Sequence, residues 1–336
     1  EHYTFSGDAE PANELILTED ELNIIVNLGL TQEDLRQLLA SPHFAEGSYA
    51  LLFELPGNDK NLVTKVWKNR KGDSERGANE NIALRLLRRR SYKNAPKLKN
   101  YLQSPNILFE EKIEGKPIEQ FEQKIIEQLA DALAKLHSIK LNAYGKLSTE
   151  RKKGTRMDCL RDGIETLHQL TASFTDQTEI VMLINRALEK VEREANKTKN
   201  AFLDTNFTLI HFDLNPGNIL YSKKDNALVI IDWEQASAGD AAMDIAKLFL
   251  KSKFNSNQKY EFFMEYGRNL SNDDPLFQGR LQVYEPFVLI NSILWRLRAL
   301  RDEPQQTSSE NEIRFYDRVK INFDVELNEL KKYLTQ

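Results

Sequence analysis

Asp213, Asn218 and Asp232 are the strongest candidates for chemistry, because each lies beside a short apolar run. Asp213 and Asn218 belong to LIHFDLNPGNILY, residues 209–221, and Asp232 follows the residues VII. The turn SKKDN predicts a hairpin over residues 219–231, which brings Asn218 and Asp232 to neighbouring strand ends. An amide oxygen and a carboxylate side by side suit Mg²⁺, which completes its shell with water and phosphates. Asp213 lies a loop away, free to orient or deprotonate an attacking hydroxyl.

The motifs around these residues resemble the aminoglycoside phosphotransferase and choline kinase-like family of the protein kinase-like superfamily. HFDLNPGN resembles its catalytic loop, and IDWEQASAGDAAMDIAKL at 231–248 is similar to its metal-binding segment. LADALAKLH at 129–137 resembles its helix ending in Leu-His, and EEKIEGKPI at 110–118 resembles its hinge. The resemblance implies an α+β, two-lobed protein kinase-like fold, with a small β-rich N-terminal lobe and a larger α-rich C-terminal lobe.

The resemblance also implies roles for individual residues. Asp213 would be the catalytic base, while Asn218 and Asp232 would bind Mg²⁺. ATP would be bound by the phosphate-covering turn Gly47 and Ser48, by Lys65 with its partner Glu80, and by the backbone from Glu111 to Ile113. The expected cofactors are therefore ATP and Mg²⁺.

Some of these roles have competitors in the sequence. Lys65 lies in the alternating stretch VTKVW, but Lys68 follows closely, and an exposed strand lysine is the alternative interpretation. Glu75 competes with Glu80 as the partner of the lysine. His211 is expected to be a buried structural residue rather than a proton carrier.

Departures from related patterns indicate the class of acceptor. Phe212 stands where regulated protein kinases carry Arg before the catalytic Asp, and Trp-Glu follows Asp232 where they carry Phe-Gly. A small hydroxyl compound is therefore favoured over a protein substrate. The expected acceptor-binding residues are Glu234, Trp295 and Arg298. Because an arginine beside a quaternary amine is repulsive, choline itself is not expected to be the acceptor.

The expected function is transfer of the γ-phosphoryl group of ATP to a hydroxyl of a small molecule, of the aminoglycoside-, choline- or thiamine-like class. Two alternatives stay open: a non-catalytic nucleotide-binding pseudokinase, and a kinase that modifies proteins.

Helices and strands must bring these residues together. Thr18 and Thr31 each precede acidic residues and an apolar periodicity, which predicts two capped helices. Residues 42–69 predict three strands around the turn PGND, and SERGANENIALRLLRR predicts a helix. Gly115 marks the main predicted boundary. Three domains are predicted: an N-terminal helical extension at 1–40, a nucleotide-binding lobe at 41–114, and a catalytic and acceptor-binding lobe at 115–336.

Composition limits the classes of partner and the cellular location that are expected. The chain has 336 residues and a net charge of −5, which argues against nucleic acid or an anionic membrane as the main partner. RLLRRR, residues 85–90, is interpreted as the solvated end of a helix. A single cysteine, Cys159, fits a reducing compartment, so a cytoplasmic location is expected. The sequence leaves the oligomeric state open.

Overall fold

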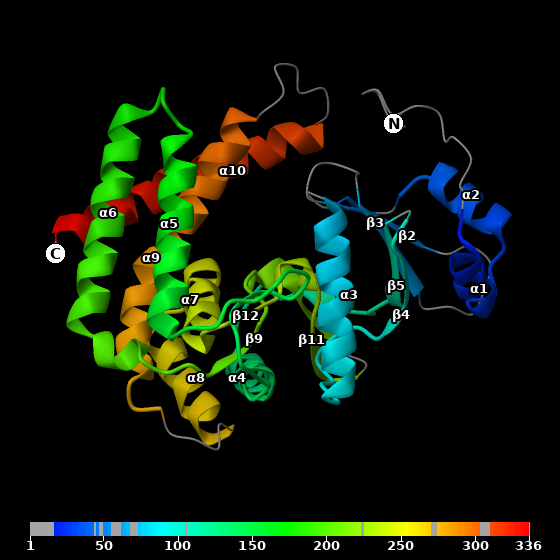
Figure 1. Ribbon diagram of the computed structural model, residues 1–336, viewed down its shortest axis with the longest axis horizontal. Coiled ribbons are helices and arrows are strands. Elements are labelled where there is room, and N and C mark those ends of the chain that lie inside the picture. Colours follow the sequence, from blue (N-terminus) through cyan, green and yellow to red (C-terminus); the bar gives the residue numbers. More distant parts are fainter. Residues whose placement is uncertain are drawn as a thin grey trace. The chain divides into compact units, whose positions relative to one another are not determined.

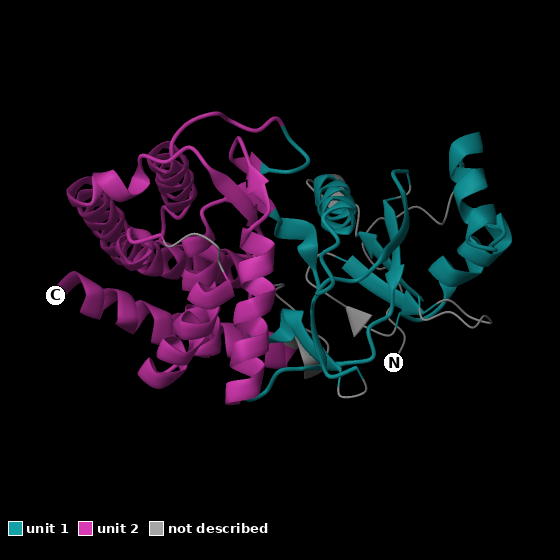
Figure 2. Cartoon of the chain, turned by 90° about the horizontal axis from the view of Figure 1, so that it is seen from below, with its two compact units in different colours: residues 1–120, 146–149, 216–236 teal, residues 121–145, 150–215, 237–336 magenta. Residues whose placement is uncertain are grey.

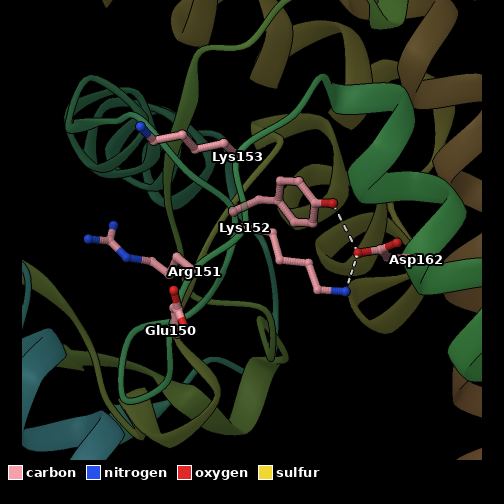
Figure 3. A pocket seen from close by; sticks show the side chains of 6 residues that line it. Glu150, Arg151, Lys152, Lys153 and Asp162 are labelled. Carbon is pink, nitrogen blue, oxygen red and sulfur yellow. Dashed lines mark hydrogen bonds and ion pairs between the residues drawn. The ribbon is translucent and has the colours of Figure 1, made fainter.

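The computed structural model describes residues 17–43, 45–46, 50–54, 62–67, 73–104, 106–222, 225–269, 274–302 and 310–335. The chain divides into two compact units (Figure 2). Unit 1 comprises residues 1–120, 146–149 and 216–236, and unit 2 comprises residues 121–145, 150–215 and 237–336. Each unit is therefore assembled from segments that are far apart in the sequence.

Unit 1 contains a five-stranded antiparallel sheet and three helices (Figure 1). The strand order is β1-β2-β3-β5-β4. The strands are β1 (Ala45–Glu46), β2 (Ala50–Glu54), β3 (Leu62–Trp67), β4 (Leu98–Leu102) and β5 (Ile107–Glu111), and the helices are α1 (Glu19–Asn27), α2 (Gln32–Ala40) and α3 (Asp73–Arg89).

The two faces of this sheet have different partners, because alternate residues of a strand point to opposite faces. Helices α1 and α2 lie against one face, where Ile25, Leu35 and Leu38 share a buried cluster with Phe53 and Phe109. Helix α3 contacts the sheet at β3, β4 and β5, on the side that carries the polar residues described below. The N-terminal helices thus complete the core of unit 1.

Both N-terminal helices begin at the threonines indicated by the sequence. The Thr18 and Thr31 hydroxyls accept from the backbone N–H of Glu21 and Asp34, and those two side chains accept from the threonine N–H groups. These reciprocal bonds are capping boxes, which satisfy donors that the first helical turn leaves unpaired. The prediction of two capped helices is confirmed.

A hairpin from the second half of the sequence joins unit 1. Strands β10 (Ile219–Ser222) and β11 (Ala227–Ile230) pair with each other, and β10 also pairs with β6 (Lys116–Pro117). The predicted boundary at Gly115 therefore lies within unit 1, which continues to Gln120.

Unit 2 is mainly helical. Helix α4 packs against α8, α7 against α9, and α9 against α6 and α10. A small sheet with the order β7-β9-β12-β8 accompanies these helices. The helices are α4 (Gln123–His137), α5 (Arg156–Ala172), α6 (Thr178–Lys197), α7 (Ala241–Ser252), α8 (Ser256–Asn269), α9 (Phe277–Arg301) and α10 (Glu310–Thr335), and the strands are β7 (Lys140–Leu141), β8 (Gly145–Lys146), β9 (Phe207–Ile210) and β12 (Ser237–Gly239).

The β-rich first unit and the helical second unit confirm the predicted α+β, two-lobed organisation. Among the described residues, no helix combines the length and the apolar character that crossing a membrane requires.

Candidate functional site

The hairpin of unit 1 places Asn218 and Asp232 at neighbouring strand ends, as the sequence indicated. Ile219 pairs with Ile230, and the N–H of Ile231 donates to the carbonyl of Asn218 at 2.9 Å. Asp232 then adopts a left-handed conformation with φ of 67°. Non-glycine residues adopt this conformation infrequently, and it turns the chain sharply out of β11.

A buried ion-pair network connects Lys65 with this turn. The Nζ of Lys65 donates to Glu80 Oε2 at 2.8 Å and also to Asp232 Oδ1. The other oxygen of Glu80 accepts from the N–H of Trp233 at 3.0 Å. Glu75, the competing glutamate, instead pairs with Lys146 at an exposed position. Lys65 therefore ties strand β3 to helix α3 and to the residues after β11.

Acidic residues outnumber cations around Lys65. We call Glu80, Glu110, Asp232 and Glu234 the acid cluster. Burial lowers the pKa of Lys65, but the charges of Asp232 and Glu80 outweigh it and raise that pKa well above its ordinary value. Burial raises the pKa of Glu80 to about 7 and that of Glu110 to about 8, with Lys65 opposing both shifts. Because burial disfavours an ionised carboxylate, Glu80 and Glu110 bind protons more tightly than exposed glutamates do.

Glu234, an expected acceptor-binding residue, is engaged inside unit 1. Its carboxylate accepts from Trp67 Nε1 at 3.3 Å and from Arg76 at 2.9 Å. The side chain of Asn79 donates to the backbone carbonyls of Glu234 and Ala236. These contacts hold the turn after Asp232 against helix α3, and they leave the acceptor role of Glu234 as a prediction.

The residues at the hairpin end fit a magnesium ion. The side chain of Asp232 is 35% exposed, whereas that of Glu80 is fully buried, so Asp232 presents the accessible carboxylate of the acid cluster. No group of three or more His, Cys, Asp and Glu side chains forms a metal site within the described ranges. Mg²⁺ needs no such cage, because it commonly binds one or two carboxylates plus substrate phosphates and water.

The predicted adenine-binding segment follows β5. The N–H of Glu111 already donates to the carbonyl of Lys97 at 3.0 Å, while the carbonyl of Ile113 accepts from Gly115. Glu111 therefore cannot use its N–H for a ligand, which leaves the N–H of Ile113 as the better candidate donor in this segment. The predicted phosphate-covering residues Gly47 and Ser48 lie outside the described residues.

In unit 2, the segment that carries Asp213 is held by a buried aspartate. The backbone N–H groups of His211 and Phe212 donate to the two oxygens of Asp244, each at 2.7 Å. His137 Nε2 lies 3.2 Å from Asp244, which explains the histidine at the end of α4. Phe212 has φ of 65°, so two charge-assisted bonds fix a turn that the residue alone would not favour. His211 is fully buried, as expected for a structural residue.

The Asp213 carboxylate has two neighbours in unit 2. Asn215 Nδ2 donates to it at 3.3 Å, and Lys247 Nζ lies 3.7 Å away. The side chain of Asp213 is 37% exposed and that of Lys247 only 13%. An accessible carboxylate held by a hydrogen bond and an ion pair is suited to accept a proton from a bound hydroxyl.

The other two expected acceptor residues lie on α9. Trp295 is partly exposed beside Arg296, and Arg298 has a 62% exposed side chain with Asp302 at 3.6 Å. Their acceptor roles stay predictions.

Sequence reasoning did not single out Glu110 or Lys247. The signal for Glu110 was an acid inside the apolar stretch ILFEE, whereas Lys247 carried no distinctive signal.

No curated protein sequence matches the chain significantly. Among solved structures, a choline kinase from Cryptosporidium parvum is similar with a TM-score of 0.61 and 16% identity, over 88% of this chain and 89% of that one. A Plasmodium vivax ethanolamine kinase gives a TM-score of 0.58 and 18% identity, over 83% and 80% of the two chains. Spectinomycin phosphotransferase in complex with ADP and spectinomycin gives 0.53 and 16%, over 82% and 88%.

These likenesses confirm the predicted protein kinase-like fold. The model of one family, described as the phosphotransferase enzyme family (APH), matches residues 44–278. That match covers more than half of the sequence and includes Lys65, the acid cluster and Asp213. The chain belongs to the phosphotransferase enzyme family.

Proposed function

We propose that this protein transfers the γ-phosphoryl group of ATP to a hydroxyl of a small molecule. The observation that carries the proposal is the network of Lys65, Glu80 and Asp232, in which a buried lysine reaches a partly exposed carboxylate. Asp213 supports it, because an accessible carboxylate precedes Asn218 by five positions in the chain.

Each residue has a distinct part in the proposed reaction. Lys65, oriented by Glu80, would bind phosphate oxygens. Asn218 and Asp232 would hold Mg²⁺, which supplies positive charge to the phosphates when it is bound. Asp213 would accept the proton of the acceptor hydroxyl as the new oxygen–phosphorus bond forms and the bond to the β-phosphate oxygen breaks, releasing ADP. Positioning and electrostatic stabilisation account for most of the acceleration in this reaction class.

The acceptor class rests on several observations together. The structural neighbours named above act on choline, ethanolamine and spectinomycin, according to their titles. Phe212 replaces the arginine through which regulated protein kinases sense phosphorylation. Trp295 offers a partly exposed aromatic side chain, which suits an acceptor with an apolar surface. A cytoplasmic location agrees with ATP as the donor and with a single cysteine.

A screen of phosphoryl acceptors tests the proposal. The wild-type protein with ATP and Mg²⁺ is assayed for ADP release against aminoglycosides, choline, ethanolamine, thiamine and sugars. We expect turnover with at least one acceptor, and we expect Asp213→Ala to abolish that turnover while ATP binding persists. Turnover retained by Asp213→Ala would contradict the assignment of the base.

The same experiment separates the alternatives. A protein that binds ATP but neither hydrolyses it nor phosphorylates any acceptor would be a pseudokinase. Incorporation of phosphate into the protein itself, without a small acceptor, would favour a kinase that modifies proteins.

A further inference from the structure

Glu110 is a buried acidic residue that the proposed reaction does not use. It lies in strand β5 and is 7% exposed. Its Oε2 atom is fully buried and has no hydrogen-bond partner among the described residues. Buried polar side-chain atoms are nearly always paired in native proteins, so such an oxygen requires an explanation.

The sheet register places Glu110 beside the nucleotide-binding residues of unit 1. Lys65 pairs with Leu108, and Val63 pairs with Glu110, so Glu110 and Lys65 lie on the same face two positions apart. The next residue, Glu111, begins the segment expected to contact the adenine.

The nearest cation does not satisfy this carboxyl group. The hydrogen bonds of Lys65 Nζ within the described residues go to Glu80 and Asp232. The charges of Glu80 and Asp232 make the environment of Glu110 still more negative, and burial raises the pKa of Glu110 to about 8. The Oε2 atom of Glu110 is thus a buried polar atom without a hydrogen-bond partner among the described residues, and it lies between Lys65 and the expected hinge.

We propose that the ionised carboxylate of Glu110 accepts a hydrogen bond from the exocyclic amino group of the nucleobase, and so favours adenine over guanine nucleotides as phosphoryl donors. The inference rests on the proposed function, because it assigns a further residue to the same nucleotide site. Adenine carries an N–H donor at C6, whereas guanine carries a carbonyl acceptor there. Two acceptors facing each other in a buried site would both remain unpaired, which penalises GTP.

A cycle of protein and ligand changes tests this contact directly. ATP, GTP and purine riboside triphosphate, which lacks the 6-amino group, are titrated by calorimetry into the wild type and into Glu110→Met with Mg²⁺. The titrations are run at pH 9, where the carboxyl of Glu110 is largely ionised and can only accept. Glu33→Gln serves as the matched control, because it removes an exposed carboxylate of the same unit.

We expect the wild type to bind ATP about tenfold more tightly than purine riboside triphosphate, and about a hundredfold more tightly than GTP. In Glu110→Met the preference for ATP over purine riboside triphosphate should fall, since this acceptor of the 6-amino group is gone. Glu33→Gln should keep the wild-type ratios. The affinity for ATP divided by that for purine riboside triphosphate is compared between the wild type and Glu110→Met. As in a double-mutant cycle, this comparison isolates the contact of Glu110 with the 6-amino group.

A second variant covers the case in which Glu110→Met does not fold. Glu110→Gln keeps the shape and presents both a donor and an acceptor. It should therefore bind GTP about tenfold more tightly than the wild type does while retaining ATP.

The outcomes separate the two claims. Equal affinity of the wild type for ATP and purine riboside triphosphate would overturn the inference and leave the proposed function intact. GTP affinity unchanged in Glu110→Gln would also overturn it. Absence of any nucleotide binding to the wild type would refute the proposed function as well.

Discussion

The substitution Glu110→Gln should change how the stability of the nucleotide-free protein depends on pH. The carboxyl has an ordinary pKa of 4.5 when it is exposed in the unfolded chain, and burial raises it to about 8 in the folded protein. The folded state therefore binds the proton more tightly than the unfolded state does. The associated stability is fully present below pH 4.5 and is lost as the pH rises through about 8.

The size of the effect follows from the shift. Each unit of pKa difference corresponds to about 1.4 kcal/mol, so the wild type should lose about 3 kcal/mol relative to Glu110→Gln between pH 5 and pH 8. The glutamine does not titrate, and the other members of the acid cluster are common to both proteins. Because the charge of Glu80 raises the pKa of Glu110, the difference reports on these two carboxyl groups together.

Urea unfolding followed by tryptophan emission measures this difference. Trp67 and Trp233 are buried in unit 1, whereas Trp295 lies in unit 2. A Trp295→Phe background therefore makes the emission report on unit 1 alone. Wild-type and Glu110→Gln curves that stay parallel from pH 5 to pH 8 would show that Glu110 is not a buried, neutral acid, and would refute the reasoning.

Three further substitutions test the other charged contacts. Lys65→Met should destabilise unit 1 by about 2–4 kcal/mol at pH 8, because it leaves buried carboxylates without their cation. The loss should be smaller at pH 6, because Glu80, with a pKa of about 7, is then mostly protonated. Urea unfolding midpoints at the two pH values measure the difference. Arg280→Met should cost unit 2 about 3–5 kcal/mol, because Arg280 is buried and its Nε donates to Asp240 at 2.6 Å; circular dichroism during urea unfolding detects the loss, and an unchanged midpoint would show that the pair contributes nothing. Lys247→Met should lower kcat about ten- to hundredfold without changing ATP affinity, because the carboxylate it helps to orient is displaced; steady-state kinetics with an acceptor from the screen decide this, and an unchanged kcat would remove the residue from the site.

Local patterns in the sequence predicted local structure well. The capping threonines and the pairing of β10 with β11 are each determined within a few residues, and the structure contains them. Strand β3 is present too, but five of its six residues are buried, so its burial does not alternate. The contact of Lys65 with Glu80 was implied by the resemblance to the family, with Glu75 as a competitor, and the structure contains the contact with Glu80.

Contacts between distant segments could not be predicted in the same way. The pairing of β6 with β10, which brings the hairpin into unit 1, depends on chain segments about one hundred residues apart. Burial of Glu110 follows only once the helix α3 and the turn at Asp232 close over the same sheet face. The orientation of Asp213 depends on Asp244, whose carboxylate binds two backbone groups that carry no sequence signal.

The segmented make-up of unit 1 has a consequence for protein synthesis. The ribosome produces strand β3 with Lys65 and helix α3 with Glu80 long before it produces Asp232 and Trp233. Synthesis of the chain between Gln120 and Ala236 takes on the order of ten seconds at about 5–20 residues per second. Throughout that interval the glutamate has its lysine but lacks the Trp233 N–H, and β6 lacks β10. The nascent first unit therefore stays incomplete until nearly half of unit 2 has been synthesised.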